Sequence, residues 1–348
     1  MQNKKSILIL GGTGAMGTFL VDILSNDLNY DVYVTTRQHD KTDYRNIKYI
    51  VGNAREREFI NELCSNKYNV IVDFMNYNLE EFQDYHNLLL DATDHYLFLS
   101  SCRVFSDAPI IDESTTRLLE TSEDIEFLKT NRYALRKARE EDILINSEYN
   151  NWTIIRPYIT YSNRRLQLGV YEKEEWLYRL LNNEPLIIQK GILDKVTTLT
   201  YGNDVALGIY NIIKNNTSLG EKINIVTDEY TTWQDILDKY LEVLKRELNI
   251  EPKIYYEEDL QDIELLFEGG YNTKYDRLWN RKFKNDKAKY FCGDINYQKV
   301  LPGVEKCLVE LIKDYKENKP IFREINTEYE TKMNNMCKQY IKKKEMIK

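Results

Sequence analysis

Three groups of residues in the first half of the chain have the types and spacing needed for acid–base and redox chemistry. Residues 11–17 read Gly-Gly-Thr-Gly-Ala-Met-Gly after an apolar run, Ser101 closes a second apolar run, and Tyr133 precedes Lys137 by four positions. Residues four apart share one face of a helix, so the ammonium of Lys137 can stabilise the phenolate of Tyr133. A free tyrosine has a pKa of about 10 and needs that help near neutral pH. We expect Ser101 to hydrogen-bond a substrate oxygen beside this phenol.

The Tyr-x-x-x-Lys spacing alone is weak evidence in a chain with 27 tyrosines. Four other pairs match it, namely Tyr44/Lys48, Tyr210/Lys214, Tyr315/Lys319 and Tyr340/Lys344. Tyr133 differs from these because it lies about thirty residues after the predicted strand 96–101, where the chemistry would need it. An ordinary amphipathic helix is the alternative interpretation of this pair.

The glycine-rich segment predicts a dinucleotide-binding turn. Residues 6–10 are short, apolar and β-branched, as in a buried strand, and residues 18–24 have the pattern of a helix. Missing Cβ atoms let the backbone approach a pyrophosphate, whose charge the helix N-terminus stabilises. A merely tight turn is the alternative, but the strand before it and the helix after it favour the dinucleotide. The predicted cofactor contacts in this turn are Gly11, Thr13, Gly14, Ala15, Met16 and Gly17.

The end of the second predicted strand, 31–36, bears on the choice of cofactor. Thr36 stands where this architecture usually places an acid for the adenosine ribose, and Arg37 follows it. A guanidinium can hold a 2'-phosphate with charge-assisted hydrogen bonds, whereas a carboxylate would repel it. Thr36 and Arg37 therefore favour NADP(H) over NAD(H). If Arg37 is solvated or stacks on the adenine, either cofactor would fit.

Alternating elements must bring these residues together. Strands are predicted near 6–10, 31–36, 47–51, 70–74, 96–101 and 152–156, separated by segments of helical length. Such alternation predicts an α/β fold, with a parallel sheet and helices on both faces. The pattern changes between Ser162 and Lys195, where an amphipathic helix over 174–181 precedes a short strand over 185–188. In open α/β sheets the ligand lies at the carboxyl ends of the strands.

Because the three groups occur in this order along the chain, it resembles the extended short-chain dehydrogenase/reductase family, the NAD(P)-dependent epimerase/dehydratase group. Residues 154–161 (IIRPYITY), 199–206 (LTYGNDVA) and 220–226 (GEKINIV) are similar to three later segments of that family. The resemblance runs from Lys5 to about Leu244. It implies a Rossmann-type, doubly wound parallel sheet with a smaller C-terminal substrate-binding lobe.

The resemblance also implies a discontinuous division of the chain. Residues 1–165, completed by about 196–226, would form the dinucleotide-binding domain. Residues 166–195 and 227–348 would form the substrate-binding lobe. The substrate would then be enclosed between the two.

Single residues acquire roles from the same resemblance. Ser101, Tyr133 and Lys137 match the family's catalytic positions. The further cofactor contacts that it implies are Asn53, Met75, Lys137 and Pro157. Met75 stands where small residues are usual, which would reshape the nicotinamide side of the pocket. Cys102 and Arg103 follow Ser101 where sugar dehydratases carry Asp-Glu, so the resemblance argues against a dehydratase, and the missing glutamate also argues against a decarboxylating member.

Substrate contacts are expected from residues with weaker patterns. Arg277 and Arg281 are four apart with an aromatic residue between them, a suitable grip for a nucleotide diphosphate with a base stacked nearby. A charged face of a surface helix is the alternative interpretation. Arg164 and Arg165, just beyond Tyr161, are further candidates. The predicted substrate contacts are Arg103, Tyr161, Arg165, Arg277 and Arg281.

Together these residues predict an enzyme that moves a hydride between NADP(H) or NAD(H) and a carbon of a nucleotide-linked sugar, as a 4-epimerase or a 4-keto reductase. A ketoreductase or isomerase of another small molecule is a second interpretation. A third is a non-catalytic NAD(P)-binding redox sensor or RNA-binding protein, because the most similar family branch includes chloroplast RNA-binding relatives. The intact set of Ser101, Tyr133 and Lys137 favours the enzyme.

The composition of the chain limits the kinds of partner that it is expected to bind. The 348 residues carry a net charge of −8, which argues against nonspecific nucleic-acid binding because that depends on neutralising phosphates. Five cysteines without a Cys-x-x-Cys spacing and three histidines predict reduced thiols and no metal site. The chain has no apolar span of membrane length, and its first residues lead straight into a strand. We therefore expect a cytoplasmic protein that binds no membrane.

The helix predicted over 131–147 bears on the oligomeric state. Extended members of the family often form dimers through the helix that carries Tyr-x-x-x-Lys. In this chain six charged residues predict a heavily charged surface there: Arg136, Lys137, Arg139, Glu140, Glu141 and Asp142. A homodimer remains the expectation.

Overall fold

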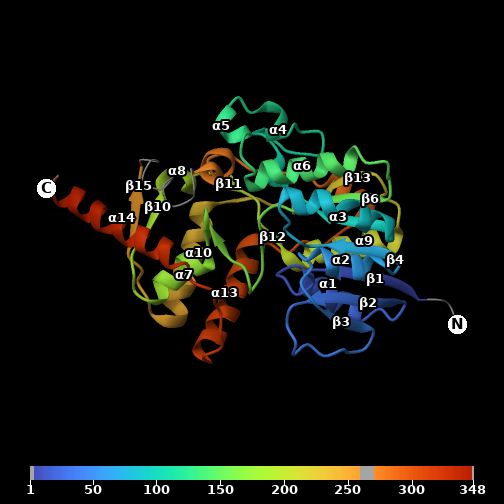
Figure 1. Cartoon of the computed structure of the whole chain (residues 1–348). Helices are drawn as coiled ribbons and strands as arrows, with labels where there is room; N and C mark the ends of the chain where they lie inside the picture. The colour runs from blue at the N-terminus through green and yellow to red at the C-terminus, as the bar shows by residue number, and fades with distance from the viewer. Residues whose placement is uncertain (1–3, 259–269, 347–348) are drawn as a thin grey trace.

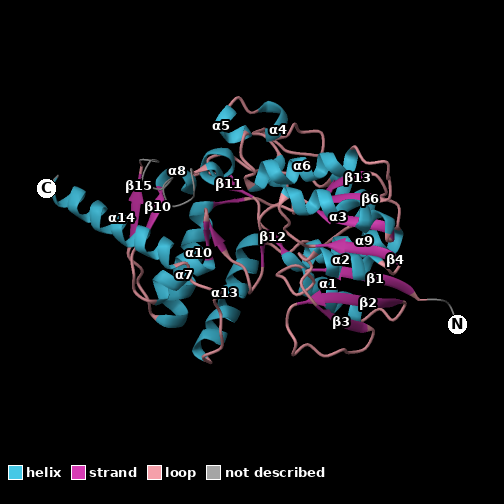
Figure 2. Cartoon of the chain, in the orientation of Figure 1, coloured by secondary structure: helices cyan, strands magenta, loops and turns pink. Residues whose placement is uncertain are grey.

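The computed structural model of the chain describes residues 4–258 and 270–346. A seven-stranded sheet occupies its N-terminal part, in the order β13-β6-β5-β4-β1-β2-β3 (Figures 1 and 2). The strands are β1 (Lys5–Leu10), β2 (Tyr30–Thr36), β3 (Ile47–Val51), β4 (Tyr68–Asp73), β5 (Thr93–Leu99), β6 (Trp152–Arg156) and β13 (Glu221–Asn224). Every pairing between them is parallel, which confirms the predicted α/β class and the six predicted strands. The strand order reverses between β1 and β4, the place where such sheets bind ligands.

Helices cover both faces of the sheet because its central strands are apolar on both sides. Ile7 and Ile9 of β1 belong to the core beneath one face, whereas Leu8 and Leu10 belong to the core beneath the other. The first face is covered by α1 (Gly17–Ser25), α9 (Gly202–Asn215) and α12 (Asp286–Cys292). The second is covered by α2 (Arg57–Cys64), α3 (Leu79–Asp91) and the end of α6 (Tyr133–Ile145).

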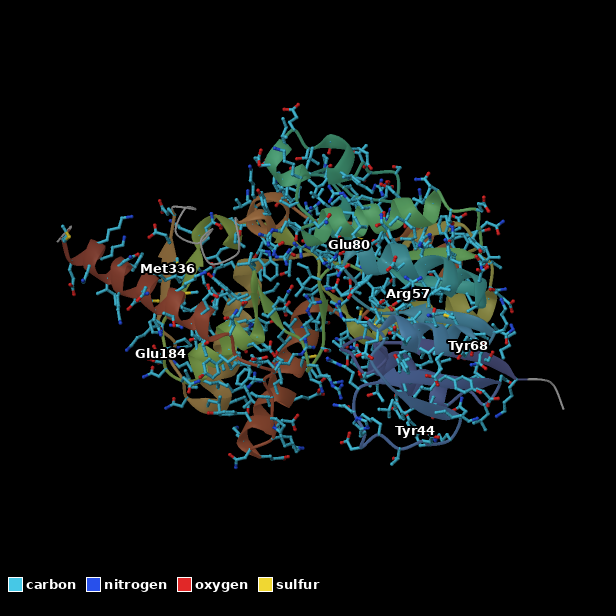
Figure 3. All side chains as sticks on the ribbon, viewed as in Figure 1. Tyr44, Arg57, Tyr68, Glu80, Glu184 and Met336 are labelled. Carbon is cyan, nitrogen blue, oxygen red and sulfur yellow. The ribbon has the colours of Figure 1, made fainter. Side chains whose placement is uncertain are left out.

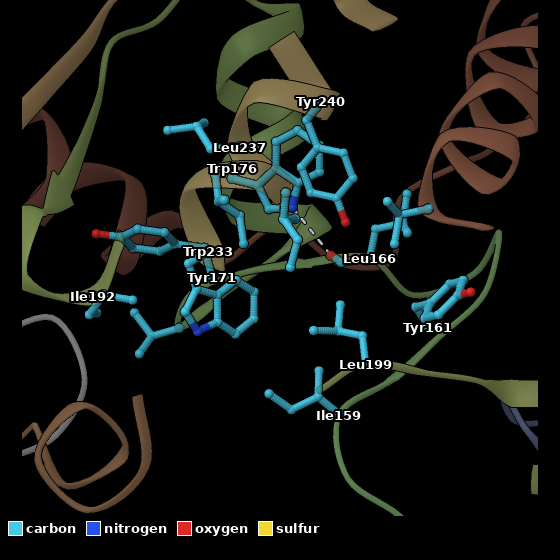
Figure 4. Packing of buried hydrophobic residues seen from close by; sticks show 14 of the residues in the cluster. Ile159, Tyr161, Leu166, Tyr171, Trp176, Ile192, Leu199, Trp233, Leu237 and Tyr240 are labelled. Atoms are coloured by element: carbon cyan, nitrogen blue, oxygen red, sulfur yellow. Dashed lines mark hydrogen bonds between the residues drawn. The ribbon is translucent and has the colours of Figure 1, made fainter. Parts of the chain in front are cut away.

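A smaller lobe lies beside the sheet, where Glu184 and Met336 mark it in Figure 3. Its main elements are α7 (Lys173–Leu181), β10 (Leu186–Gln189), α8 (Lys190–Leu193), α10 (Trp233–Leu248), β15 (Ile254–Glu257), α13 (Val300–Lys316) and α14 (Thr327–Met346). In its core, Trp176 stacks on Tyr240 with 4.5 Å between ring centroids, and the indole N–H donates to the carbonyl of Leu166 at 3.2 Å (Figure 4). The helix and the strand predicted between Ser162 and Lys195 are α7 and β10.

The remaining elements are short. They are η1 (Cys102–Val104), α4 (Leu118–Thr121), α5 (Ile125–Leu128), β7 (Thr160–Tyr161), β8 (Gln167–Leu168), β9 (Tyr171–Glu172), β11 (Val196–Thr197), β12 (Thr200–Tyr201), β14 (Thr231–Thr232) and η2 (Thr273–Arg277). Within residues 4–258 and 270–346, no helix is long and apolar enough to cross a membrane. The cytoplasmic location stays a prediction.

A buried histidine in β5 makes the fold sensitive to acid. The ring of His95 is fully buried, with Nδ1 2.9 Å from Oδ1 of Asn216 and Nε2 2.7 Å from Oγ1 of Thr153. Burial lowers the pKa of His95 to about 4, below its ordinary value of 6.5. The unfolded chain therefore binds a proton first as the pH falls, so this contribution to stability is complete above about pH 6.5 and is lost towards pH 4.

We expect His95→Gln to remove much of that acid sensitivity. Between pH 7 and pH 4.5 the free energy of unfolding of the wild type should fall by about 2–3 kcal/mol more than that of the variant, at about 1.36 kcal/mol per pKa unit. Urea unfolding at both pH values measures the difference. His39→Gln is the control, because His39 is exposed. An equal acid loss in all three proteins would contradict the role of His95.

Candidate active site

A cavity of about 580 Å³ lies between the carboxyl ends of the sheet strands and the smaller lobe. Its wall contains residues from all three groups that the sequence singles out, together with arginines from beyond residue 160. The lining residues with predicted roles are Gly11, Gly14, Ala15, Met16, Gly17, Met75, Ser101, Arg103, Tyr133, Lys137, Pro157, Arg165 and Arg277. The fold therefore assembles the predicted catalytic residues and most predicted cofactor contacts in one place.

The turn between β1 and α1 has room only for hydrogen at two of its glycines. A Cβ atom at Gly17 would lie 2.7 Å from the Cα atom of Gly12, and one at Gly12 would lie 2.7 Å from Cγ1 of Val34. The amides of Ala15 and Met16 donate no backbone hydrogen bond within the described chain, so they are available to an anion at the start of α1. A dinucleotide pyrophosphate fits this cradle.

Two serines follow β5, and their surroundings give them different tasks. Ser100 is buried and donates a hydrogen bond to Glu141. Ser101 is the N-cap of η1, and its side-chain oxygen accepts the amide N–H of Arg103 at 3.2 Å. The hydroxyl hydrogen of Ser101 is left for another acceptor, because this contact uses only its oxygen. Ser101 can therefore donate to an oxygen in the cavity.

Tyr133 and Lys137 come from the first two turns of α6. The Tyr133 ring contacts two guanidinium groups, with Cζ of Arg103 5.1 Å and Cζ of Arg136 5.8 Å from its centroid. Lys137 is 2% exposed, and its Nζ lies 2.8 Å from Oε2 of the fully buried Glu140. Burial raises the pKa of Glu140, while Lys137 and Arg136 oppose the rise. The sequence analysis placed Glu140 on the helix surface and missed its pairing with Lys137, although the i,i+3 spacing was a usable signal.

Glu141 ties α6 to the sheet. Its Oε1 accepts from Nε of Arg156 at 2.7 Å and its Oε2 from Nη2 at 2.6 Å, and Nη1 of Arg117 lies 3.2 Å away. Burial by itself would raise the pKa of Glu141, but Arg156, Ser100 and Arg117 outweigh it and hold the pKa below its ordinary value. Such pairing inside the protein keeps the helix in register with β6.

This arrangement corrects the predicted surface of α6. Lys137, Glu140 and Glu141 are buried, so three of the six charges are internal ion-pair members and not surface groups. The prediction was wrong because their partners include a residue on β6, outside the helix itself. The homodimer stays a prediction.

Two predicted substrate contacts do not line the cavity. Arg281 is 1% exposed, and its guanidinium donates to Asp276 at 2.9 Å and to the carbonyls of Ser106 and Phe105 at 3.0 and 3.1 Å. It lies beyond the end of η2, so the four-residue spacing from Arg277 does not place the two on one helix face. Tyr161 is also buried, and its hydroxyl packs where a Cβ of residue 303 would lie. Both belong to the protein interior and are left out of the substrate site.

The other four predicted cofactor contacts, Thr13, Thr36, Arg37 and Asn53, do not line the cavity. Thr13 lines a neighbouring groove of about 850 Å³, together with Gly12 and Lys41. Thr36 is buried, and its hydroxyl oxygen accepts the amide N–H of residue 38 at 3.1 Å. Arg37 is exposed and makes no hydrogen bond or ion pair with the described residues. Its guanidinium group is therefore available to bind a phosphate.

Asn53, predicted to contact the adenine, is engaged in the turn before α2. Its Nδ2 donates to Oε1 of Glu56 at 3.1 Å, and its Oδ1 accepts the amide N–H of Arg55 at 3.2 Å. A contact with the adenine would need one of these hydrogen bonds to be shared or exchanged.

The cavity wall is strongly cationic, in contrast to the net charge of −8 for the whole chain. Six cationic side chains line it: Arg103, Lys137, Arg164, Arg165, Arg277 and Arg323. Two carboxylates line it, those of Glu172 and Glu174. Arg323 was missed by sequence reasoning, because it comes from the link between α13 and α14, which carries no motif. The excess of positive charge suits ligands with several negative charges.

Comparisons with known proteins bear on the family and the fold of the chain. Residues 7–226 match the family model described as the NAD dependent epimerase/dehydratase family. A search of curated proteins finds no match.

Solved structures show the same fold at low sequence identity. The Bordetella bronchiseptica enzyme WbmH in complex with NAD+ has a TM-score of 0.65 at 14% identity, over 89% of this chain and 99% of that one. The UDP-N-acetylglucosamine 4-epimerase from Methanobrevibacter ruminantium in complex with UDP-N-acetylmuramic acid has a TM-score of 0.65 at 13% identity, over 91% and 100%. The UDP-glucuronic acid 4-epimerase from Bacillus cereus in complex with NAD has a TM-score of 0.61 at 16% identity, over 89% and 99%.

Proposed function

Since the chain belongs to the NAD dependent epimerase/dehydratase family, we propose that it is a nicotinamide-dependent enzyme acting at C4 of a nucleotide-linked sugar, as a 4-epimerase or a 4-keto reductase. The observation that carries the proposal is that Ser101, Tyr133 and Lys137 line one cavity with the glycine turn of β1 and α1. The two UDP-sugar 4-epimerases among the structural neighbours support a nucleotide sugar as the substrate.

Each of the three residues has a task in this reaction. The hydroxyl of Tyr133 gives a proton to the sugar oxygen in the reductive direction and takes it back in the oxidative one. Ser101 donates a hydrogen bond to the same oxygen, and the ammonium of Lys137 stabilises the phenolate that remains. The nicotinamide, when bound, supplies and accepts the hydride.

The cationic wall would hold the rest of both ligands. The free amides of Ala15 and Met16 at the start of α1 bind the pyrophosphate of the dinucleotide. Arg165 and Arg277 line the cavity from the segment after β7 and from η2, so they are the proposed contacts for the diphosphate of the sugar nucleotide. Arg165 pairs with Glu172 at 2.8 Å, and the buried Arg277 donates from Nε to the carbonyl of Gly169 at 2.8 Å, so the diphosphate would share these donors. Arg164 reaches the glycine turn, where its Nη1 donates to the carbonyl of Thr13 at 3.3 Å.

The proposed cofactor preference is NADP(H) over NAD(H), supported by the exposed Arg37 after β2. The structural neighbours in complex with NAD favour NAD(H) instead, so the cofactor preference is tested directly. Mass spectrometry of the purified protein identifies any dinucleotide that co-purifies. Tightly retained NAD would favour the epimerase, and exchangeable NADPH would favour the reductase.

We expect Arg37→Ala to weaken NADPH binding about tenfold or more, because a charge-assisted hydrogen bond contributes about 1.5–3 kcal/mol. The affinity for NADH should stay within about threefold, since that cofactor has no 2'-phosphate to lose. Titrations that follow nicotinamide fluorescence measure both. Arg57→Ala, which removes another exposed arginine, is the matched control. Equal weakening of the two cofactors would assign Arg37 to the adenine and remove the support for NADP(H).

A further inference from the structure

Arg103 places a positive charge beside the proposed acid and base. It lies two residues after Ser101, lines the cavity, and has its Cζ 5.1 Å from the centroid of the Tyr133 ring. Its Nε is 3.4 Å from Oδ2 of Asp276, and its Nη2 donates to Asn272. Its Nη1 makes no hydrogen bond to any residue that the structure describes. This edge of the guanidinium is available to a ligand.

The charges around Arg103 are unbalanced. Four guanidinium groups gather between η1, η2 and the segment after β7. Among the described residues their direct ion pairs use two carboxylates, while Asp107 and Glu174 act on Arg281 and Arg165 from farther away. The guanidinium groups are those of Arg103, Arg165, Arg277 and Arg281, and the carboxylates are those of Asp276 and Glu172. Burial lowers the pKa of Arg103, and repulsion from Arg165 and Arg281 adds to the decrease. An anionic group from the ligand would offset the remaining positive charge.

The position of Arg103 identifies which ligand group it can meet. In a hexopyranose, C4 lies across the ring from C1, the carbon that carries the diphosphate, and its ring neighbours are C3 and C5. A side chain beside the phenol of Tyr133 is therefore close to the substituents of C3 and C5 and far from the diphosphate. A guanidinium pairs with a carboxylate through two parallel hydrogen bonds.

We propose that Arg103 binds a carboxylate on the sugar ring, so that the substrate is a nucleotide-linked sugar acid and not a neutral nucleotide sugar. This inference rests on the proposed function, because it takes C4 as the reacting carbon. Arg165 and Arg277 would still bind the diphosphate. Arg103 would distinguish a sugar acid from a neutral sugar.

The test compares UDP-glucuronic acid with UDP-glucose, which differ only in the group at C6. Isothermal titration of each into the protein saturated with whichever of NAD and NADP+ it binds more tightly gives the two affinities. The wild type should prefer the acid by about tenfold or more, and Arg103→Gln should bind both within about threefold of each other. Arg103→Lys, which keeps the charge but loses the paired hydrogen bonds, should retain part of the preference. Unchanged NAD affinity in both variants shows that the site has folded.

The outcomes separate this inference from the proposed function. Equal affinity of the wild type for the two ligands overturns the inference and leaves the proposed function standing. Equal weakening of both ligands in Arg103→Gln also overturns it, because Arg103 would then hold the diphosphate. If NAD binds but neither UDP-sugar does, the nucleotide-sugar assignment falls, and the inference falls with it. If neither NAD nor NADP(H) binds, the proposed function itself is wrong.

Discussion

Replacing Tyr133 with phenylalanine is expected to lower turnover about 10³-fold, because it removes the hydroxyl that moves the proton. The ring stays, and so do its contacts with Arg103 and Arg136, so dinucleotide affinity should remain that of the wild type. Hydride transfer to a 4-keto nucleotide sugar, followed by the absorbance of the reduced nicotinamide, measures the loss. Fluorescence titration of the same preparation measures cofactor affinity.

The control for this variant lies in the same chain. Tyr315 has the same spacing to Lys319 as Tyr133 has to Lys137, but its ring is 41% exposed and lies outside the cavity. Tyr315→Phe should therefore turn over normally. A Tyr133→Phe enzyme with wild-type turnover would refute the assigned acid–base role.

Gly17→Ala is expected to weaken dinucleotide binding about a hundredfold or more. The new methyl carbon would lie 2.7 Å from Cα and from the carbonyl oxygen of Gly12, and a backbone cannot yield as a side chain does. The turn would have to open, and the hydrogen bonds from its amides to the pyrophosphate, at about 1.5–3 kcal/mol each, would be lost. Titration with reduced nicotinamide cofactor measures the change.

Gly14→Ala is the matched comparison within the same turn. Its methyl carbon would meet only the carbonyl oxygen of Gly11, at the ordinary distance of 3.4 Å. The backbone should keep its shape, so a smaller loss is expected from any contact of the methyl group with the ligand. Far-ultraviolet circular dichroism shows whether either variant has lost its fold. Undiminished binding by Gly17→Ala would mean that the pyrophosphate lies elsewhere.

The sheet and its glycine turn could be predicted because their signals are local. Residues 7–10 are fully buried on both faces of the sheet, and a strand in that position must be continuously apolar. The turn that follows needs glycine for steric reasons, and glycines after a short apolar run can be recognised directly in a sequence. Tyr133 and Lys137 were predictable for a related reason, since one helix face and a fixed distance from a strand define their place.

The errors concern charged and aromatic residues whose partners come from distant segments. Glu141 was predicted to be a surface group because its partners, Arg156 and Arg117, lie outside its helix. Arg281 looked like a ligand contact, although Asp276 and two carbonyls already use its donors. Helical periodicity tells which residues share a face, but it does not tell which buried charges are paired.

Because Arg323 comes from the link between α13 and α14, it is among the last residues of the site to be synthesised. The cavity wall proposed for the dinucleotide comes from residues up to Pro157, whereas Arg277 and Arg323 are synthesised much later. Domains generally fold as units, with the N-terminal one first during synthesis. Because β13 completes the sheet and α12 covers one of its faces, the unit that holds the dinucleotide is complete only after residue 292, when Arg277 is already present and Arg323 is not. Cofactor captured at that stage would stabilise the growing chain by mass action, before Arg323 has joined the cavity wall.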